Sequence, residues 1–120
     1  MVATISRAEL KTKIDRRETF MLVETLPAAA YHHAHLPGAI NLPPDQVTQL
    51  APTLLPDKTA DIVVYCAKPT WNASENTARE LAALGYTNVR DYAEGKQDWI
   101  DAGLPTESEH QHWRIGNGSK

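Results

Sequence analysis

The sequence has only one cysteine, Cys66, among 120 residues. A single thiol cannot form an internal disulfide, and it builds no zinc site without several other ligands. No apolar run approaches the roughly 20 residues that cross a bilayer, and the first ten residues lack the apolar stretch of a secretory signal peptide. We therefore expect a cytoplasmic protein in a reducing compartment, where a lone thiol stays available for chemistry.

An excess of positive charge is also absent. Twelve Lys and Arg residues stand against 15 Asp and Glu residues, which gives a formal net charge of -3. Proteins that bind nucleic acid or anionic membranes need a basic excess to neutralise phosphates, so we expect neither partner. The hydrophobic share of 42% is ordinary for a soluble globular protein. The length fits one domain.

Short apolar runs alternate with helical patterns along the chain. The clearest strand pattern occupies positions 61–66, and the clearest helix pattern occupies positions 72–84 and ends at Gly85. Weaker strand patterns lie at 3–5, 20–23, 39–42 and 88–92, and further helices are expected at 27–33, at 95–102, after Ser6 and after Asp45. This order predicts an α/β fold with a mainly parallel central sheet of about five strands and helices on both faces.

Local signals refine the element boundaries. Ser6 and Glu9 have capping-box spacing at the start of the first helix. Asp45 is placed to cap a helix that contains Val47 and Leu50. Beyond position 106 the chain is polar and unpatterned. We therefore expect one domain over residues 1–106 and a mobile tail over residues 107–120.

Cys66 ends the clearest strand and precedes the clearest helix. Ligands of α/β sheets bind beyond the carboxyl ends of the strands. A helix N-terminus stabilises a nearby anion by on the order of 1 kcal/mol, which favours thiolate over thiol. Loop N–H groups can also surround a bound anion. The layout predicts a nucleophile that can hold a second, anionic sulfur; the equally weighted alternative is a small buried hydrophobic residue.

Four motifs, in order, resemble the rhodanese-like family. The stretch LVETLPAAAYHHAHLPGAINLP resembles the family's first signature, with Glu24 where Asp is usual and Ala34 where Gly is usual. IVVYC resembles the strand that ends in the active-site cysteine, which places that role on Cys66. LAALGYTNV resembles the next helix end and strand, and AEGKQDWIDAGLP resembles the closing G-G-x-x-x-W signature, with Glu94 at the first Gly. The resemblance spans residues from about 5 to about 105.

The resemblance implies a thiosulfate sulfurtransferase. Cys66 takes sulfur from a donor such as thiosulfate, holds it as a persulfide and passes it to a thiol, to cyanide or to a protein acceptor, without cofactor or metal. The loop implied to bind the sulfur consists of Ala67, Lys68, Pro69, Thr70, Trp71, Asn72, Ala73 and Ser74. The residues implied to support the site are Glu24, His35, Gly38, Gly95 and Trp99, the last in the core.

The loop after Cys66 departs from the family pattern. It is two residues longer and lacks the usual Arg, so Lys68 is its only cation. The missing Arg disfavours a phosphatase, which needs it for a phosphate dianion. Trp71 either walls the pocket or fills the space left by the longer loop. Glu24 together with Leu26, which replaces another usual Arg, removes an ion pair of the family. These departures support the alternative of a catalytically silent module that binds a partner.

Five histidines raise the possibility of a metal site. His32, His33 and His35 have a spacing that suits tetrahedral coordination poorly on one short helix, and His110 and His112 are distant in sequence. No thiolate or carboxylate accompanies them in the motif. We therefore expect no metal, a solvated His32 and His33, and a structural His35.

Overall fold

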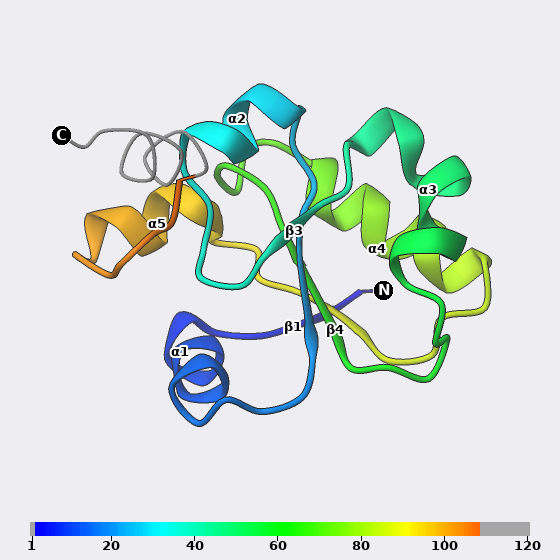
Figure 1. Cartoon of the computed structure of the whole chain (residues 1–120), viewed down its shortest axis with the longest axis horizontal. Helices are drawn as coiled ribbons and strands as arrows, with labels where there is room; N and C mark the ends of the chain where they lie inside the picture. Colours follow the sequence, from blue (N-terminus) through cyan, green and yellow to red (C-terminus); the bar gives the residue numbers. More distant parts are fainter. Residues whose placement is uncertain (1, 109–120) are drawn as a thin grey trace, which may run out of the picture.

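The computed structural model describes residues 2–108 (Figure 1), and its sheet has five strands that are all parallel. The strands are β1 (Ala3–Thr4), β2 (Met21–Glu24), β3 (Ile40–Asn41), β4 (Ile62–Tyr65) and β5 (Val89–Asp91), in the spatial order β1-β5-β4-β2-β3. The helices are α1 (Arg7–Asp15), α2 (Ala28–His33), α3 (Val47–Leu54), α4 (Ala73–Ala83) and α5 (Gly95–Asp101), with a 3-10 turn, η1 (Pro44–Gln46), before α3. The predicted α/β fold is confirmed.

Two apolar clusters cover the two faces of the sheet because side chains alternate along each strand. Ile62 and Val64 of β4 pack with residues of α3 and α4 on one face. Val63 and Tyr65 pack on the other face with residues of α1 and α5, including Trp99, which is 1% exposed. Burial on both faces explains why β4 has a continuous apolar run. At the carboxyl end of β4, the next residue in this alternation is Cys66, on the α4 side.

The two capping predictions had different outcomes. Ser6 and Glu9 form the complete capping box at the start of α1. The prediction that Asp45 caps a helix was wrong, because Asp45 lies inside η1 and the N-cap of α3 is Gln46, without a side-chain cap. Pro44 in the first turn of η1 explains the difference, since its fixed φ suits a tight helical turn before the helix proper.

The first two residues of the predicted tail contact the domain. Glu107 forms an antiparallel bridge with His35, and its carboxylate accepts a hydrogen bond from the Gly38 N–H at 3.0 Å. The Ser108 hydroxyl donates to the His32 carbonyl. Contacts of the domain therefore extend past the predicted boundary at 106. The rest of the tail, with His110 and His112, lies outside the described residues.

The end of α1 places a non-glycine residue in the left-handed region. Arg17 has φ 54°, where its N–H donates to the Ile14 carbonyl. Left-handed backbone costs an L-residue about 1–2 kcal/mol, and glycine avoids this but loses about 0.5–1 kcal/mol in chain entropy. We expect Arg17→Gly to raise the free energy of unfolding by about 0.5–1 kcal/mol in urea denaturation. Arg16→Gly is the matched control, because Arg16 has φ -83° and should only lose stability; equal losses in both variants contradict the prediction.

Candidate active site

Cys66 lies directly after β4 and is 1% exposed. Within the described part of the chain, its sulfur has three close polar neighbours. The Trp71 carbonyl oxygen is 3.1 Å from Sγ, the Ser74 hydroxyl is 3.5 Å away, and the Lys68 carbonyl oxygen is 3.7 Å away. The chain from β4 to α4 therefore curls around the sulfur, but carbonyl oxygens, and not the predicted loop N–H groups, face it. In this geometry the thiol is the hydrogen-bond donor.

The loop exposes most of its side chains while its backbone encloses the sulfur. The exposed loop residues are Lys68, Pro69, Thr70, Trp71 and Asn72, whereas Ala67 and Ala73 are half-buried and Ser74 is buried. Trp71 is 50% exposed, and the Lys68 ammonium lies 6.0 Å from the centroid of its ring. This exposure argues against a space-filling Trp71, because the carbonyl of the residue, and not its ring, reaches the sulfur.

The N-terminus of α5 fixes the start of this loop. The Lys96 N–H donates to the Cys66 carbonyl at 2.8 Å, and the Gln97 N–H donates to the Ala67 carbonyl at 2.9 Å. The N–H and C=O of a trans peptide point in opposite directions, so the N–H groups of Ala67 and Lys68 point away from α5. Within residues 2–108 neither N–H has an acceptor. Two oriented donors therefore follow the cysteine, although neither contacts the sulfur in this geometry.

Gly95 allows α5 to approach the loop. Its φ is +82°, and a Cβ at this position would lie 2.8 Å from the Ala67 carbonyl oxygen and 2.9 Å from that of Cys66. Both neighbours are backbone atoms that cannot move without shifting the loop. The glycine of the closing signature is therefore a geometric requirement of the peptides that hold the cysteine.

A buried ion pair lies beneath the site, which the sequence reasoning missed. Glu24 is fully buried, and its Oε2 is 3.0 Å from the Lys96 ammonium. Leu26 provides no cation to Glu24, as the departure from the family pattern indicates, but the cation comes instead from Lys96 of α5. The missed signal was a lysine in the first turn of a helix, where positive charge is unfavourable unless a carboxylate compensates it.

The ion pair belongs to a wider hydrogen-bond network. The Tyr65 hydroxyl donates to Glu24 Oε1 at 2.7 Å, and burial and the Glu24 charge raise the pKa of that phenol. The Lys96 ammonium also donates to the carbonyls of Ala30 at 3.2 Å and Ala34 at 2.6 Å. The network joins the end of α2, the ends of β2 and β4, and α5, and it therefore holds together the elements around Cys66.

The histidine segment has a structural environment. His35 is buried, its Nδ1 is 2.8 Å from the Tyr31 carbonyl, and its ring stacks on the Tyr31 ring at 3.9 Å. Gly38, with φ +80°, forms the turn that follows. His32 and His33 are exposed. Among residues 2–108, no three His, Cys, Asp or Glu side chains gather as a metal site would require.

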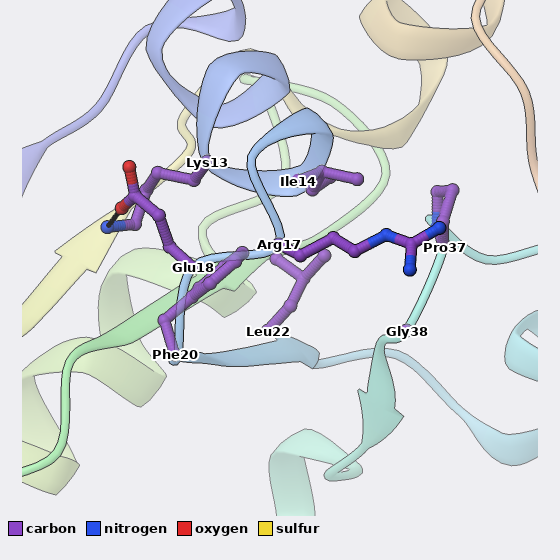
Figure 2. Close-up of a pocket in the computed structure, with 8 residues that line it drawn as sticks. All are labelled: Lys13, Ile14, Arg17, Glu18, Phe20, Leu22, Pro37 and Gly38. Carbon is purple, nitrogen blue, oxygen red and sulfur yellow. Dashed lines mark hydrogen bonds and ion pairs between the residues drawn. The ribbon is translucent and has the colours of Figure 1, made fainter.

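A cavity of about 190 Å³ lies elsewhere in the domain (Figure 2). It is lined by Lys13, Ile14, Arg17, Glu18, Phe20, Leu22, Pro37 and Gly38. These residues surround the amino ends of β2 and β3, whereas Cys66 lies at the carboxyl end of β4. In Figure 2 the Arg17 side chain extends toward Pro37, and Lys13 pairs with Glu18. The cavity is therefore separate from the cysteine site.

Comparison with known proteins agrees with this geometry. The family model of the rhodanese-like domain matches residues 6–102. The chain belongs to the rhodanese-like domain family. The solved structures that it resembles include rhodanese-like proteins. The BH2092 protein from Bacillus halodurans superposes with a TM-score of 0.81 at 26% identity, covering 89% of this chain and 77% of that one. A rhodanese from E. coli solved with anions gives a TM-score of 0.62 at 28% identity, covering 75% and 99%.

Curated relatives of this rhodanese-like domain include sulfurtransferases at modest identity. The adenylyltransferase and sulfurtransferase UBA4 of Candida albicans is 30% identical over 81% of this chain and 23% of that protein. The thiosulfate sulfurtransferase PspE of Escherichia coli is 38% identical over 51% of this chain and 57% of that protein. The HTH-type transcriptional regulator Rv0324 of Mycobacterium tuberculosis is 32% identical over 86% and 44%. The chain thus spans less than two thirds of each relative. No helix within residues 2–108 is long and apolar enough to cross a membrane.

Proposed function

We propose that this domain transfers sulfane sulfur through a persulfide on Cys66. The supporting observation is the placement of Cys66 at the end of β4, inside a loop whose first two peptides are fixed by α5. A nucleophile that must hold an anion needs oriented donors. The N–H groups of Ala67 and Lys68 are oriented by α5, although they do not contact the sulfur before the loop turns. The sulfurtransferases among the relatives support the same reaction class.

Thiosulfate is the proposed sulfur donor. The Cys66 thiolate attacks the outer sulfur of thiosulfate; the new S–S bond forms as the old one breaks, and sulfite leaves with the bonding electron pair. An acceptor thiolate or cyanide then attacks the outer sulfur of the persulfide, and Cys66 returns as thiolate. The exposed Lys68 ammonium attracts the anionic donor. The relative YrkF, called a putative sulfur carrier protein, makes a protein acceptor a further candidate. A reducing, cytoplasmic setting suits a free thiol.

The loop must change to hold a persulfide. The carbonyl oxygens of Lys68 and Trp71 face Sγ, and they repel an anionic sulfur. The turn between them rests on one backbone hydrogen bond, from the Trp71 N–H to the Lys68 carbonyl at 3.0 Å. The side chains of this segment are exposed, so the turn can reorient at small cost. The proposed sulfur-binding segment is therefore the whole loop from Ala67 to Ser74, turned with its N–H groups inward.

The test is intact-protein mass spectrometry after incubation with thiosulfate. We expect the protein to gain one sulfur atom that cyanide or a thiol removes, because Cys66 is the only thiol in the sequence. Cys66→Ser keeps the size of the side chain and should gain none. The enzymatic proposal fails if the wild-type protein gains no sulfur from thiosulfate, from polysulfide or from an aromatic thiosulfonate.

A silent binding module is the second candidate. Two carbonyl oxygens accept from the sulfur, which favours a buried thiol that serves only as a hydrogen-bond donor, and one relative is a transcriptional regulator. The discriminating measurement is the rate of Cys66 alkylation at neutral pH. A rate limited by global unfolding, measured by its dependence on urea, supports the silent module. A rate independent of low urea concentrations supports the enzyme.

A further inference from the structure

Asp91 is a buried acid that the proposed function does not yet use. It ends β5, is 5% exposed, and its Oδ1 is buried without a hydrogen-bond partner among the described residues. Asp91 is paired in register with Val64, which packs on the α4 side of the sheet. Because side chains alternate along β4, Cys66 lies on the same face. The acid and the thiol therefore occupy neighbouring strand ends beneath α4.

Ser74 lies between these two groups. It is 3% exposed in the first turn of α4, and its hydroxyl is 3.5 Å from the Cys66 sulfur, which donates to it. The same hydroxyl forms a side-chain hydrogen bond with the Asp91 carboxyl. Burial raises the pKa of Asp91, the Ser74 hydroxyl partly offsets this rise, and the charge of Glu75 adds to it. A thiol, a hydroxyl and a carboxyl thus follow one another in a buried row.

Only one of the three acceptors near the sulfur leads to a base. The carbonyl oxygens of Trp71 and Lys68 can accept a hydrogen bond but cannot take a proton away. The Ser74 hydroxyl can accept a proton on one side while it gives its own to Asp91 on the other. A nucleophile, an intermediate group and a base in contact are the usual arrangement for activating a thiol or hydroxyl.

We propose that Asp91 accepts the Cys66 proton through the Ser74 hydroxyl and so generates the thiolate. This inference rests on the proposed function and supplies its first step. The S–H bond breaks as the proton goes to Ser74 Oγ, and the O–H bond of Ser74 breaks as its proton goes to an Asp91 oxygen. Nothing is oxidised or reduced. One negative charge moves from the carboxylate to the sulfur, and Asp91 acts as a positioning residue through Ser74.

The surroundings of Asp91 suit this exchange. A carboxyl whose pKa is raised toward neutrality is a stronger proton acceptor than an ordinary one. The groups that act on it are Ser74 and Glu75 of α4, and Cys66 lies on the same face of the adjacent strand β4, while the neighbouring strand β1 (Ala3–Thr4) carries no titratable side chain. Among residues 2–108 no cation pairs with Asp91, so its negative charge is costly where it is. Once the carbonyls of Lys68 and Trp71 have turned away, the charge is better placed on the sulfur, near the α4 N-terminus.

The experiment measures the alkylation rate of Cys66 by iodoacetamide in the full chain from about pH 5 to about pH 9. We expect Asp91→Asn and Ser74→Ala each to lower the neutral-pH rate by about tenfold or more and to move the rise of the profile to higher pH. The double variant should be no slower than the single ones, because both changes interrupt one relay. The proposal would be overturned by a pH profile that does not change in the single variants. It would also be overturned by a double variant whose alkylation rate falls by the product of the two single reductions.

A matched control and a stability measurement exclude a merely structural effect. Thr25 and Thr77 form a buried hydroxyl pair at 2.7 Å, so Thr25→Val with Thr77→Val removes buried hydroxyls outside the relay. Its alkylation profile should match the wild type.

The raised pKa of Asp91 means that the folded state binds its proton more tightly, so wild-type stability falls as pH rises above the ordinary value of 3.8. Asp91→Asn should lack this fall and be the more stable protein at neutral pH; a less stable Asp91→Asn speaks against the buried charge.

The two proposals can fail separately. Alkylation reports formation of the thiolate, whereas the mass gain from thiosulfate reports transfer of sulfur. If alkylation follows the expected profiles but no sulfur is gained, the relay stands and the sulfurtransferase proposal falls. If the persulfide forms at the same rate and with the same pH dependence in Asp91→Asn and in wild type, the sulfurtransferase stands and the relay falls.

Discussion

Gly95→Ala should lower the free energy of unfolding by about 3 kcal/mol. It should also abolish the reaction of the Cys66 thiol with alkylating agents. The left-handed φ of +82° alone costs alanine about 1–2 kcal/mol. The added Cβ also meets the carbonyl oxygens of Cys66 and Ala67 at 2.9 and 2.8 Å, and relieving that overlap costs about 1–3 kcal/mol more. The overlap is relieved only if α5 moves away from the loop. This movement breaks the hydrogen bonds that the Lys96 and Gln97 N–H groups donate to the loop carbonyls.

Gly103→Ala separates the two causes. Gly103 follows the same helix with φ +78°, but a Cβ there meets nothing within 4 Å. Its free energy of unfolding should fall only by the cost of placing alanine in the left-handed region, about 1–2 kcal/mol, and the alkylation rate of Cys66 should not change. Urea denaturation and thiol alkylation measure both quantities. Equal losses of stability in the two variants, or an unaltered Cys66 rate in Gly95→Ala, contradict the assigned role of the α5 contact.

The sequence could predict the parts of the fold that depend on local patterns. The apolar run that became β4, the amphipathic pattern that became α4, and the capping box at Ser6 each depend on residues close in the chain. The placement of Cys66 between strand and helix followed from the same patterns. Asp45 shows the limit, since prolines at 43 and 44 produced a 3-10 turn that a residue-type rule for caps does not consider.

The missed features depend on residues far apart in sequence. Lys96 and Glu24 are separated by 72 positions, and Asp91 meets Ser74 only because β5 and α4 pack together. Local sequence patterns do not report contacts between residues that are distant in the chain. The sequence pattern also did not predict the direction of the loop peptides. It indicated that loop N–H groups surround the sulfur, whereas the carbonyls of Lys68 and Trp71 face the sulfur. Backbone orientation in a loop follows from its tethers, here the N-terminus of α5.

Lys96→Met should destabilise the domain by about 3–5 kcal/mol, because it leaves a buried carboxylate without its cation. Glu24 is fully buried and, within residues 2–108, would keep only the Tyr65 hydroxyl as a partner of its carboxylate. The carbonyls of Ala30 and Ala34 would also lose their donor, so α2 should loosen against α5. Thermal and urea unfolding measure the loss, and hydrogen exchange at α2 reports the loosening.

Two further variants test the buried pair itself. Glu24→Gln combined with Lys96→Met removes both charges and should recover part of the stability that Lys96→Met loses, since no uncompensated buried charge remains. Lys11→Met is the matched control, because Lys11 pairs with Asp15 at 2.6 Å on an exposed helix surface and should cost less than about 0.5 kcal/mol. The contrary result is a double variant whose free energy of unfolding is lower than that of Lys96→Met by the full separate effect of Glu24→Gln. Glu24 and Lys96 would then act independently, and their ion pair would not be what holds α2, β2 and α5 around the cysteine.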